Sequence, residues 1–208
     1  MSLRVKICGI TNLADAEAAI AAGADALGFI LYEKSKRFIP IERAIEIVEA
    51  LPPFVQTVAV TVNATREFTN LGWRKQLKHF GVAQLHGQES PVHVKAVGKY
   101  LPVIKVFPAD QAAAMSPESY AASAFMLDTP SKDHGGTGQA FDWSLAVAFK
   151  QRTAKPLILS GGLNPENVAK AIETVHPYAV DVNSGVEASP GRKDHAQLQK
   201  FIRICKSF

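Results

Sequence analysis

The stretch Leu157-Ile158-Leu159-Ser160-Gly161-Gly162-Leu163-Asn164-Pro165 contains the signals that decide the fold. Its apolar residues predict a short strand buried on both faces, and the two glycines behind them predict a tight turn. Asn164 and Pro165 are typical of the start of a helix, because proline is favoured at the first helical position. Apolar residues at helical spacing then lead to the run Ala179–Val182, which predicts the next strand.

The same alternation of a short apolar run and a helical segment extends along the whole chain. Eight runs are predicted as strands: Leu3–Cys8, Ala26–Ile30, Val55–Thr61, Val82–Leu85, Val103–Phe107, Phe125–Asp128, Leu157–Leu159 and Ala179–Val182. Helices are expected to begin near Asn12, Ile41, Thr65, Ser90, Asp110, Phe141, Asn164 and Asp194.

Eight βα units without a composition break favour one α/β domain over residues 1–208, a single closed (β/α)8 TIM barrel. An open, doubly wound sheet is the alternative. It is less favoured because it usually has fewer strands in this length. No G-x-G-x-x-G motif follows the first strand, which also argues against a dinucleotide cofactor.

The composition is that of an ordinary globular domain, with 47% hydrophobic and 20% charged residues among 208. The formal net charge is +4, but the basic residues are scattered, so no nucleic-acid partner is expected. Prolines interrupt the longest uncharged run, and no membrane span is expected. Two cysteines, Cys8 and Cys205, are typical of a reducing, cytoplasmic compartment.

In a barrel of this kind, the loops at the carboxyl ends of the strands carry the active site. Two loops with glycines, Ser160-Gly161-Gly162-Leu163 and Asn183-Ser184-Gly185, follow the last two strands. Glycine lets backbone N–H groups approach a phosphate, and this is the usual phosphate position in the fold. The sequence therefore predicts a small phosphorylated substrate, the alternative being that these glycines only form tight turns.

Two reactive side chains end predicted strands, Cys8 the first and Asp128 the sixth. Lys6 lies on the same strand face as Cys8, where a cation would favour the thiolate. Asp181 on the neighbouring strand is the expected partner of Lys6. The alternatives are a structural lysine–aspartate pair, a cysteine that acts as a small hydrophobic residue, and an aspartate that caps the loop behind it.

Further candidates lie in the loops at the same end of the barrel. Arg37 can offer two parallel hydrogen bonds to a carboxylate, although a solvated arginine is the common alternative. His86 is either a substrate contact or a histidine bonded to the backbone. The glycine-rich segment 134–138 is expected to be a lid or a connector. No set of cysteines and histidines has the spacing of a metal site.

Six short motifs follow one another along the chain: Lys6-Ile7-Cys8-Gly9, Gln84-Leu85-His86-Gly87, Leu127-Asp128, Gly135-Gly136-Thr137-Gly138, Ser160-Gly161-Gly162-Leu163-Asn164-Pro165-Glu166-Asn167 and Asp181-Val182-Asn183-Ser184-Gly185-Val186-Glu187. In this order and spacing they resemble the phosphoribosylanthranilate isomerase family of tryptophan biosynthesis. The resemblance runs from Val5 to the C-terminal helix. Each motif alone is weak, and their common order makes the resemblance specific.

The resemblance implies an isomerase that performs an Amadori rearrangement without a metal or organic cofactor. Its substrate would be N-(5-phosphoribosyl)anthranilate and its product 1-(o-carboxyphenylamino)-1-deoxyribulose 5-phosphate. The resemblance further implies Cys8 as general base, Asp128 as general acid and Arg37 as the residue that binds the anthranilate carboxylate. The loops at Gly161-Gly162 and Ser184-Gly185 correspond to the phosphate site of the family.

The chain departs from the family pattern at two places. Lys36 stands where the family commonly has proline, which removes a backbone constraint before Arg37, and Asn183 replaces a frequent serine. Two other functions remain open: another phosphosugar enzyme such as an aldolase, and a barrel that binds a phosphorylated ligand without catalysis. The sequence also leaves open whether the protein is a monomer or a homodimer.

Overall fold

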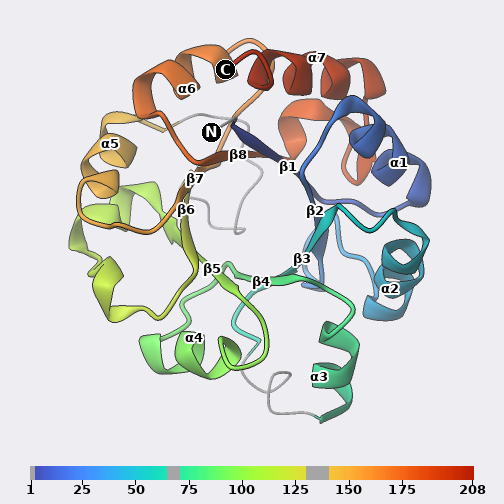
Figure 1. Cartoon of the computed structure of the whole chain (residues 1–208), viewed down its shortest axis with the longest axis horizontal. Coiled ribbons are helices and arrows are strands. Elements are labelled where there is room, and N and C mark those ends of the chain that lie inside the picture. Colours follow the sequence, from blue (N-terminus) through green and yellow to red (C-terminus); the bar gives the residue numbers. More distant parts are fainter. Residues whose placement is uncertain (1–2, 65–70, 130–140) are drawn as a thin grey trace.

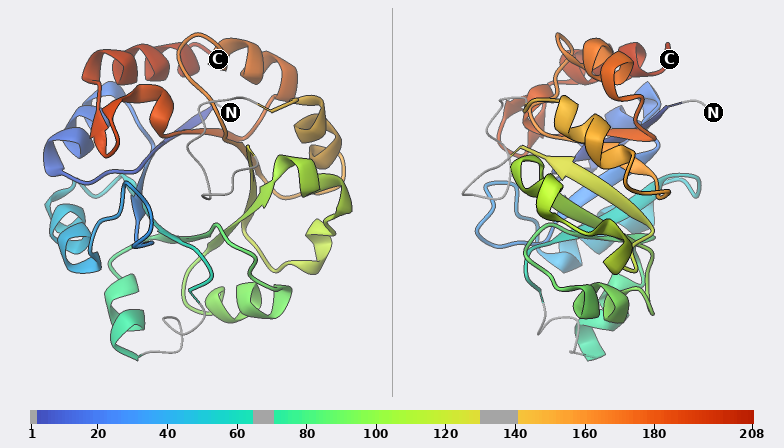
Figure 2. Two further views of the ribbon diagram at one scale, coloured as in Figure 1. Left: turned by 180° about the vertical axis from the view of Figure 1, so that it is seen from behind. Right: turned by 90° about the vertical axis from the view of Figure 1, so that its left-hand side faces the viewer.

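The computed structural model describes residues 3–64, 71–129 and 141–208. Its centre is a closed barrel of parallel strands in chain order, ringed by helices (Figure 1 and Figure 2). The strands are β1 Arg4–Cys8, β2 Ala26–Ile30, β3 Gln56–Thr61, β4 Val82–Leu85, β5 Val103–Pro108, β6 Ala124–Asp128, β7 Leu157–Leu159 and β8 Ala179–Val182. The predicted (β/α)8 barrel is confirmed.

The α-helices of the described residues lie around the barrel and begin and end at local signals in the sequence. They are α1 Leu13–Ala22, α2 Ile41–Ala50, α3 Leu71–Leu77, α4 Pro91–Val97, α5 Ser144–Lys150, α6 Val168–Val175 and α7 His195–Cys205. Asn12 and Asp194 accept hydrogen bonds from the first turns of α1 and α7, and Gly23 ends α1 with a left-handed φ of 102°. None of the helices in the described ranges is long and apolar enough to cross a membrane.

Two expected helices differ from the structure. The segment at Asp110 forms a short 3₁₀ helix, η2 Ala109–Ala114, instead of an α-helix. It buries only Ala109 and Ala112, three residues apart, which suits a helix with three residues per turn. Asn164 does not cap α6 directly. Its side chain accepts two backbone N–H bonds in a turn, and α6 begins three residues later than that prediction.

The sequence did not predict the segment between β8 and α7. A 3₁₀ turn, η4 Ser184–Val186, leads into a small antiparallel hairpin of β9 Glu187–Ser189 and β10 Arg192–Lys193. Lys193 on this hairpin is buried, and its backbone N–H donates to the Asp15 carboxylate in α1. The hairpin is therefore bound to α1 and to the loop before it, and it brings polar side chains to the mouth of the barrel.

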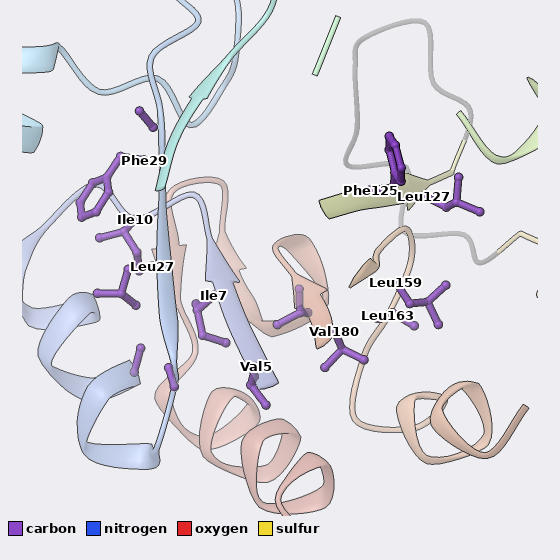
Figure 3. Packing of buried hydrophobic residues seen from close by; sticks show 14 of the residues in the cluster. Val5, Ile7, Ile10, Leu27, Phe29, Phe125, Leu127, Leu159, Leu163 and Val180 are labelled. Atoms are coloured by element: carbon purple, nitrogen blue, oxygen red, sulfur yellow. The ribbon is translucent and has the colours of Figure 1, made fainter. Parts of the chain in front are cut away.

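Alternation along the strands separates two hydrophobic layers. Large apolar side chains such as Ile7, Phe125 and Leu127 point outward and pack between the barrel and the helices (Figure 3). The intervening residues point into the barrel, where a second cluster contains Cys8 and Met126. This period of two places polar side chains of β1, β4, β6 and β8 on the inner face. The active-site candidates follow from that placement.

Candidate active site

Cys8 lies inside the barrel at the end of β1, directly beside Lys6. A methyl group built on Gly28 of β2 would lie 2.8 Å from Sγ of Cys8 and 3.0 Å from Nζ of Lys6. A glycine on β2 thus leaves room for both side chains. Nζ of Lys6 donates to Oδ1 of Asp181 at 2.7 Å, with both side chains buried. The predicted lysine–aspartate pair is confirmed.

Charge and burial act in opposite directions on the Cys8 thiol. Burial raises the pKa of Cys8, the positive charge of Lys6 lowers it, Asp181 raises it and Lys193 lowers it, with a net rise above the ordinary value. Burial also disfavours the charge on Lys6, but Asp181 and Cys8 together raise the pKa of Lys6, so that it stays cationic. Lys6 thus acts in the expected direction, although burial keeps the resting thiol protonated.

Asp128 ends β6 and points into the barrel mouth. Its Oδ1 accepts the backbone N–H of Thr129 at 2.7 Å, and its Oδ2 lies 3.1 Å from Nε2 of His86. The other ring nitrogen of His86, Nδ1, lies 3.2 Å from the side-chain Nε2 of Gln84. His86 is therefore bonded to side chains, and neither of the two roles expected for it includes its contact with Asp128.

A cavity of about 510 Å³ opens beside this carboxyl group. Asp128 and His86 line this cavity together with the aromatic side chains of Phe107 and Tyr120. Lys105 also lines the cavity and donates to Glu89 at 2.8 Å and to the carbonyl oxygen of Gly87 at 2.7 Å. The acid candidate therefore has open space beside it.

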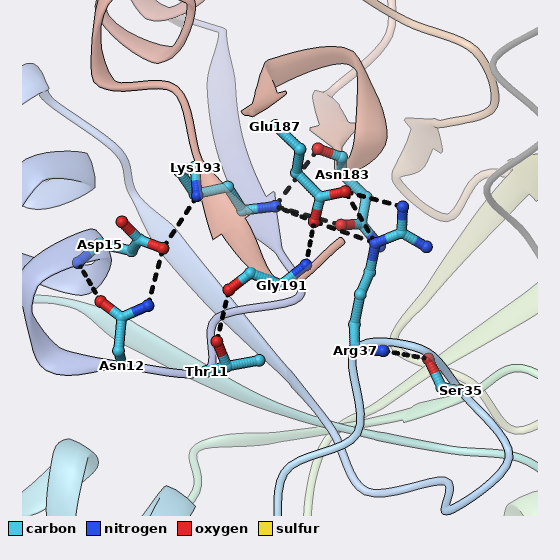
Figure 4. A network of polar contacts seen from close by, with 9 residues as sticks. All are labelled: Thr11, Asn12, Asp15, Ser35, Arg37, Asn183, Glu187, Gly191 and Lys193. Carbon is cyan, nitrogen blue, oxygen red and sulfur yellow. Dashed lines mark hydrogen bonds and ion pairs between the residues drawn. The ribbon is translucent and has the colours of Figure 1, made fainter. Parts of the chain in front are cut away.

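Arg37 lies at the barrel mouth with its guanidinium on a carboxylate of the protein itself (Figure 4). Its Nη2 donates to Oε2 of Glu187 at 2.7 Å, and its Nε donates to both carboxylate oxygens at 2.9 Å. The Nη1 group makes no hydrogen bond within the described part of the chain and remains for a further acceptor. The adjacent Lys36 is exposed, and Ser35 Oγ accepts the backbone N–H of Arg37, which holds the loop without the family's proline.

Lys193 completes this polar cluster and was not found from the sequence. Its Nζ donates to the side-chain and backbone oxygens of Asn183 and to Glu187, at 3.1–3.2 Å (Figure 4). Burial alone would raise the pKa of Glu187, but Arg37 and Lys193 hold it below the ordinary value. Nothing near Lys193 in the sequence indicates this position, because the hairpin that carries it was not predicted.

The two glycine-containing loops lie against each other, as predicted. Gly161 and Gly162 have left-handed φ values of 86° and 64°, which favour glycine. A methyl group on Gly185 would lie 1.9 Å from the carbonyl oxygen of Leu163, so that only glycine allows the loops to approach so closely. Within the described residues, the backbone N–H groups of Gly161, Gly162, Ser184 and Gly185 donate to no protein acceptor. They are available to an anion.

Ser160 joins this loop to the residues around Cys8. Its Oγ donates to Oδ2 of Asp181 at 3.1 Å, while Oδ1 of the same carboxylate accepts from Lys6. The glycine-rich segment 134–138 lies outside the described residues, and its expected role stays a prediction. Among the residues that the structure describes, no group of three or more histidine, cysteine, aspartate or glutamate side chains could hold a metal ion.

The family model for N-(5'phosphoribosyl)anthranilate (PRA) isomerase matches residues 5–204. The chain belongs to the N-(5'-phosphoribosyl)anthranilate isomerase family. Among named members of this isomerase family, it is 46% identical to that of Geobacter metallireducens over 99% of this chain and all of the relative. It is 48% identical to the Pseudomonas fluorescens isomerase, with 99% of each chain covered.

Solved structures of the same isomerase family agree with this placement. The crystal structure of the Thermotoga maritima phosphoribosyl anthranilate isomerase is 43% identical and matches with a TM-score of 0.88 over 99% of this chain and all of that chain. A structure of such an isomerase in complex with reduced 1-(o-carboxyphenylamino)-1-deoxyribulose 5-phosphate matches with a TM-score of 0.85 at 42% identity, over the same shares. The family resemblance seen in the sequence is therefore confirmed.

Proposed function

We propose that this chain converts N-(5'-phosphoribosyl)anthranilate to 1-(o-carboxyphenylamino)-1-deoxyribulose 5-phosphate, with Cys8 as general base and Asp128 as general acid. One observation carries the assignment of these roles. A thiol on β1 and a carboxyl on β6 lie on either side of β7 and β8, and the loops of β7 and β8 present free N–H groups. A phosphate bound there would place the sugar between the two side chains.

The reaction begins at the sugar ring oxygen. Asp128, in its neutral form, gives a proton to this oxygen, and the bond from the oxygen to C1 breaks with its electron pair on the oxygen. The lone pair of the anthranilate nitrogen then forms an iminium with C1. This iminium acidifies the proton on C2, which the Cys8 thiolate removes to leave an enolamine. Loss of the enol proton and protonation of C1 complete the ketone.

The cations on the base side support the role of Cys8. Its thiol must lose a proton, and Lys6 and Lys193 both favour the thiolate against the effect of burial. At neutral pH an ordinary aspartate is ionised and an ordinary cysteine protonated, which is the reverse of the states required. The reaction therefore needs surroundings that favour the opposite state of each group.

Substrate recognition combines an anion site and a carboxylate site. The phosphate binds to the N–H groups around Gly161, Gly162, Ser184 and Gly185, while the anthranilate carboxylate binds Arg37. Glu187 holds Arg37 in place and uses two of its nitrogens, which leaves Nη1 for the substrate. Asn183 supports the Arg37–Glu187 pair indirectly, because its side chain accepts a hydrogen bond from Lys193. His86 is the remaining candidate for substrate contact, and its contact with Asp128 supports this role.

The direct experiment incubates the purified protein with phosphoribosylanthranilate and follows the loss of its fluorescence. Turnover by the parent protein, lost in Cys8→Ala and Asp128→Asn, would support the proposal. A protein that binds the substrate without turnover would instead be a ligand-binding barrel. No loss of fluorescence and no binding would contradict the proposed substrate.

An aldolase-type reaction is less well supported, because it needs a free lysine at the mouth of the barrel. Lys6 is paired with Asp181 below the mouth, and Lys105 points out of the barrel, where Glu89 and backbone carbonyl oxygens occupy its ammonium group. Borohydride reduction in the presence of a phosphosugar would trap a Schiff base on an aldolase. We expect no such adduct.

The assembly and location of the protein are also proposals. The Thermotoga maritima relative is described as dimeric in a structure that is 40% identical to this chain. We expect a monomer or a homodimer for this chain, and light scattering of the purified protein distinguishes the two. Both cysteines are free and buried, which supports a reducing cytoplasmic compartment.

A further inference from the structure

Gln84 is a fully buried side chain on the inner face of β4, two residues before His86 in the sequence. Its amide nitrogen lies 3.2 Å from Nδ1 of His86, while its amide oxygen, Oε1, is buried and has no hydrogen-bond partner among the described residues. A buried amide oxygen without a partner is unfavourable, and such groups in native proteins call for an explanation. The hydrophobic packing of the barrel does not supply one, because a leucine or methionine would fill the same space.

The contacts of His86 define one state of this group of residues. With the Gln84 amide nitrogen as donor, Nδ1 of His86 is the acceptor, and the ring proton is on Nε2. This Nε2–H donates to Oδ2 of Asp128, and Oδ1 accepts the N–H of Thr129. Asp128 is then a carboxylate with two donors. That state has one proton too few to open the sugar ring.

Addition of one proton requires a second arrangement of the same side chains. With Nδ1 and Nε2 of His86 both protonated, Nδ1–H needs an acceptor, and the Gln84 nitrogen cannot serve. A half turn of the amide exchanges its nitrogen and oxygen, after which Oε1 accepts Nδ1–H. The turn leaves one amide atom without a partner before and after. The bond from the cationic ring to Oε1 is the stronger of the two, because a hydrogen bond to a charged group contributes more than one between neutral groups.

We propose that Gln84 is a positioning residue whose Oε1 accepts the Nδ1 proton of His86 when the His86–Asp128 pair takes up the proton used in catalysis. The proton enters at His86 and is shared along the bond between Nε2 and Oδ2. It then leaves from the Asp128 carboxyl to the ring oxygen of the substrate. Afterwards His86 is neutral with its proton on Nδ1, and Asp128 is a carboxylate. The inference rests on the proposed function, since it explains how the acid of that reaction is loaded.

The surroundings allow this proton uptake. His86 and Asp128 line the 510 Å³ cavity, which gives the pair a route to solvent. Among the described residues that line this cavity, the other ionisable groups are Glu89, Lys105 and Tyr120, of which Glu89 and Lys105 form an ion pair without net charge. On the inner face of the barrel, Lys6 and Asp181 form a second ion pair beside Cys8, and the charge of Lys193 also acts on the Cys8 thiol. His86 is thus the ionisable side chain in direct contact with Asp128 on this side of the mouth.

The test is a pH titration of the His86 ring nitrogens by ¹⁵N NMR in the substrate-free protein, with His86→Gln to assign the signals. Gln84→Met fills the space but offers no acceptor to Nδ1–H, so the midpoint of proton uptake should fall by about one pH unit. Gln84→Glu offers a stronger acceptor, and the midpoint should rise. Ile104→Val, at the β5 position paired with Gln84, changes packing alone and should leave the midpoint unchanged.

Kinetics with phosphoribosylanthranilate give the second measurement. In Gln84→Met we expect kcat to fall about tenfold and KM to stay within about twofold, because the lost bond lies away from the substrate. The inference would be overturned by equal midpoints of proton uptake in Gln84→Met and Gln84→Glu, or by a kinetic change confined to KM. The titration needs no turnover, so a parent protein that titrates as expected but does not isomerise the substrate would contradict the proposed function separately.

Discussion

The two sides of the barrel mouth surround their reactive groups with different charges and different access to solvent. On the side of β1 and β8, the thiol of Cys8 is enclosed, and the buried cations Lys6 and Lys193 act on it. On the side of β4 and β6, Asp128 meets the imidazole of His86 and borders an open cavity. A neutral thiol that must become an anion benefits from nearby cations, whereas a carboxyl group that must gain a proton needs a donor and access to water. The difference teaches how one barrel can hold a base and an acid a few strands apart.

The largest effect is expected from removal of either reacting group. Cys8→Ala and Asp128→Asn should each lower kcat by ~10²–10⁴, the usual contribution of a positioned base or acid. Steady-state kinetics would measure this, and circular dichroism should match the parent. Cys205→Ala is the matched control, because burial raises the pKa of Cys205 to about 12 and α7 holds it far from the mouth. A near-normal kcat in either active-site variant would show that the changed residue is not the base or acid of the reaction.

The buried ion pair of Lys6 and Asp181, beside Cys8, gives a prediction about stability. Lys6→Met leaves Asp181 as an unpaired buried charge and should lower the free energy of unfolding by about 3–5 kcal/mol, measured in urea. The double variant Lys6→Met with Asp181→Leu should recover most of that stability, since an apolar pair of similar size replaces the ions. Its kcat should nevertheless stay low, because the cation beside Cys8 is gone. A fully active double variant would show that the pair is only structural.

The predicted carboxylate site on the side of β1 and β8 is tested by substitution of two neighbouring cationic residues. Arg37→Ala should raise KM about 10- to 100-fold, as expected for the loss of a charge-assisted hydrogen bond, with a smaller fall in kcat. Exposed Lys36 offers the control, and Lys36→Ala should change KM little. If Lys36→Ala is the damaging change, the carboxylate contact belongs to Lys36 instead.

The smallest effect concerns the ion pair of Glu89 and Lys105, which line the cavity beside Asp128. Burial alone would raise the pKa of Glu89, but the charge of Lys105 and hydrogen bonds lower it below the ordinary value. A carboxyl whose pKa is depressed on folding contributes stability above its unfolded pKa near 4.3, and this contribution is lost as pH falls through the folded value. Urea midpoints of the parent and Glu89→Gln should therefore differ at pH 7 and converge towards pH 3. Glu118→Gln, at an exposed glutamate, should follow the parent. Curves that stay parallel would contradict the assignment.

Much of the fold follows from local signals that the sequence contains. Apolar runs predicted all eight strands, and Asn12 and Asp194 cap helices as expected. These signals are readable because caps and strand runs involve residues close together in the chain. Two failures have the same origin. The segment at Asp110 was too short for the expected helix, and the β9–β10 hairpin has no apolar alternation to reveal it.

Part of the site was equally readable. In a closed barrel the first and last strands are neighbours, and Lys6 and Asp181 lie at matching positions, so their pairing could be predicted from the sequence. The end of each strand indicated Cys8 and Asp128, and the glycines indicated two adjacent loops. These inferences need only the strand order and the period of two along a strand.

Only the tertiary structure decided how the side chains use these positions. Arg37 meets Glu187 across 150 residues, and Lys193 reaches both Glu187 and Asn183 from a hairpin that the sequence did not reveal. The chain of Gln84, His86 and Asp128 joins two strands that are not neighbours in the barrel. Such contacts depend on the tilt of the strands and the course of the loops above them, which sequence spacing does not determine. The sequence by itself thus specified which groups stand at the mouth, and the closure of the barrel determined which of them share a proton or a charge.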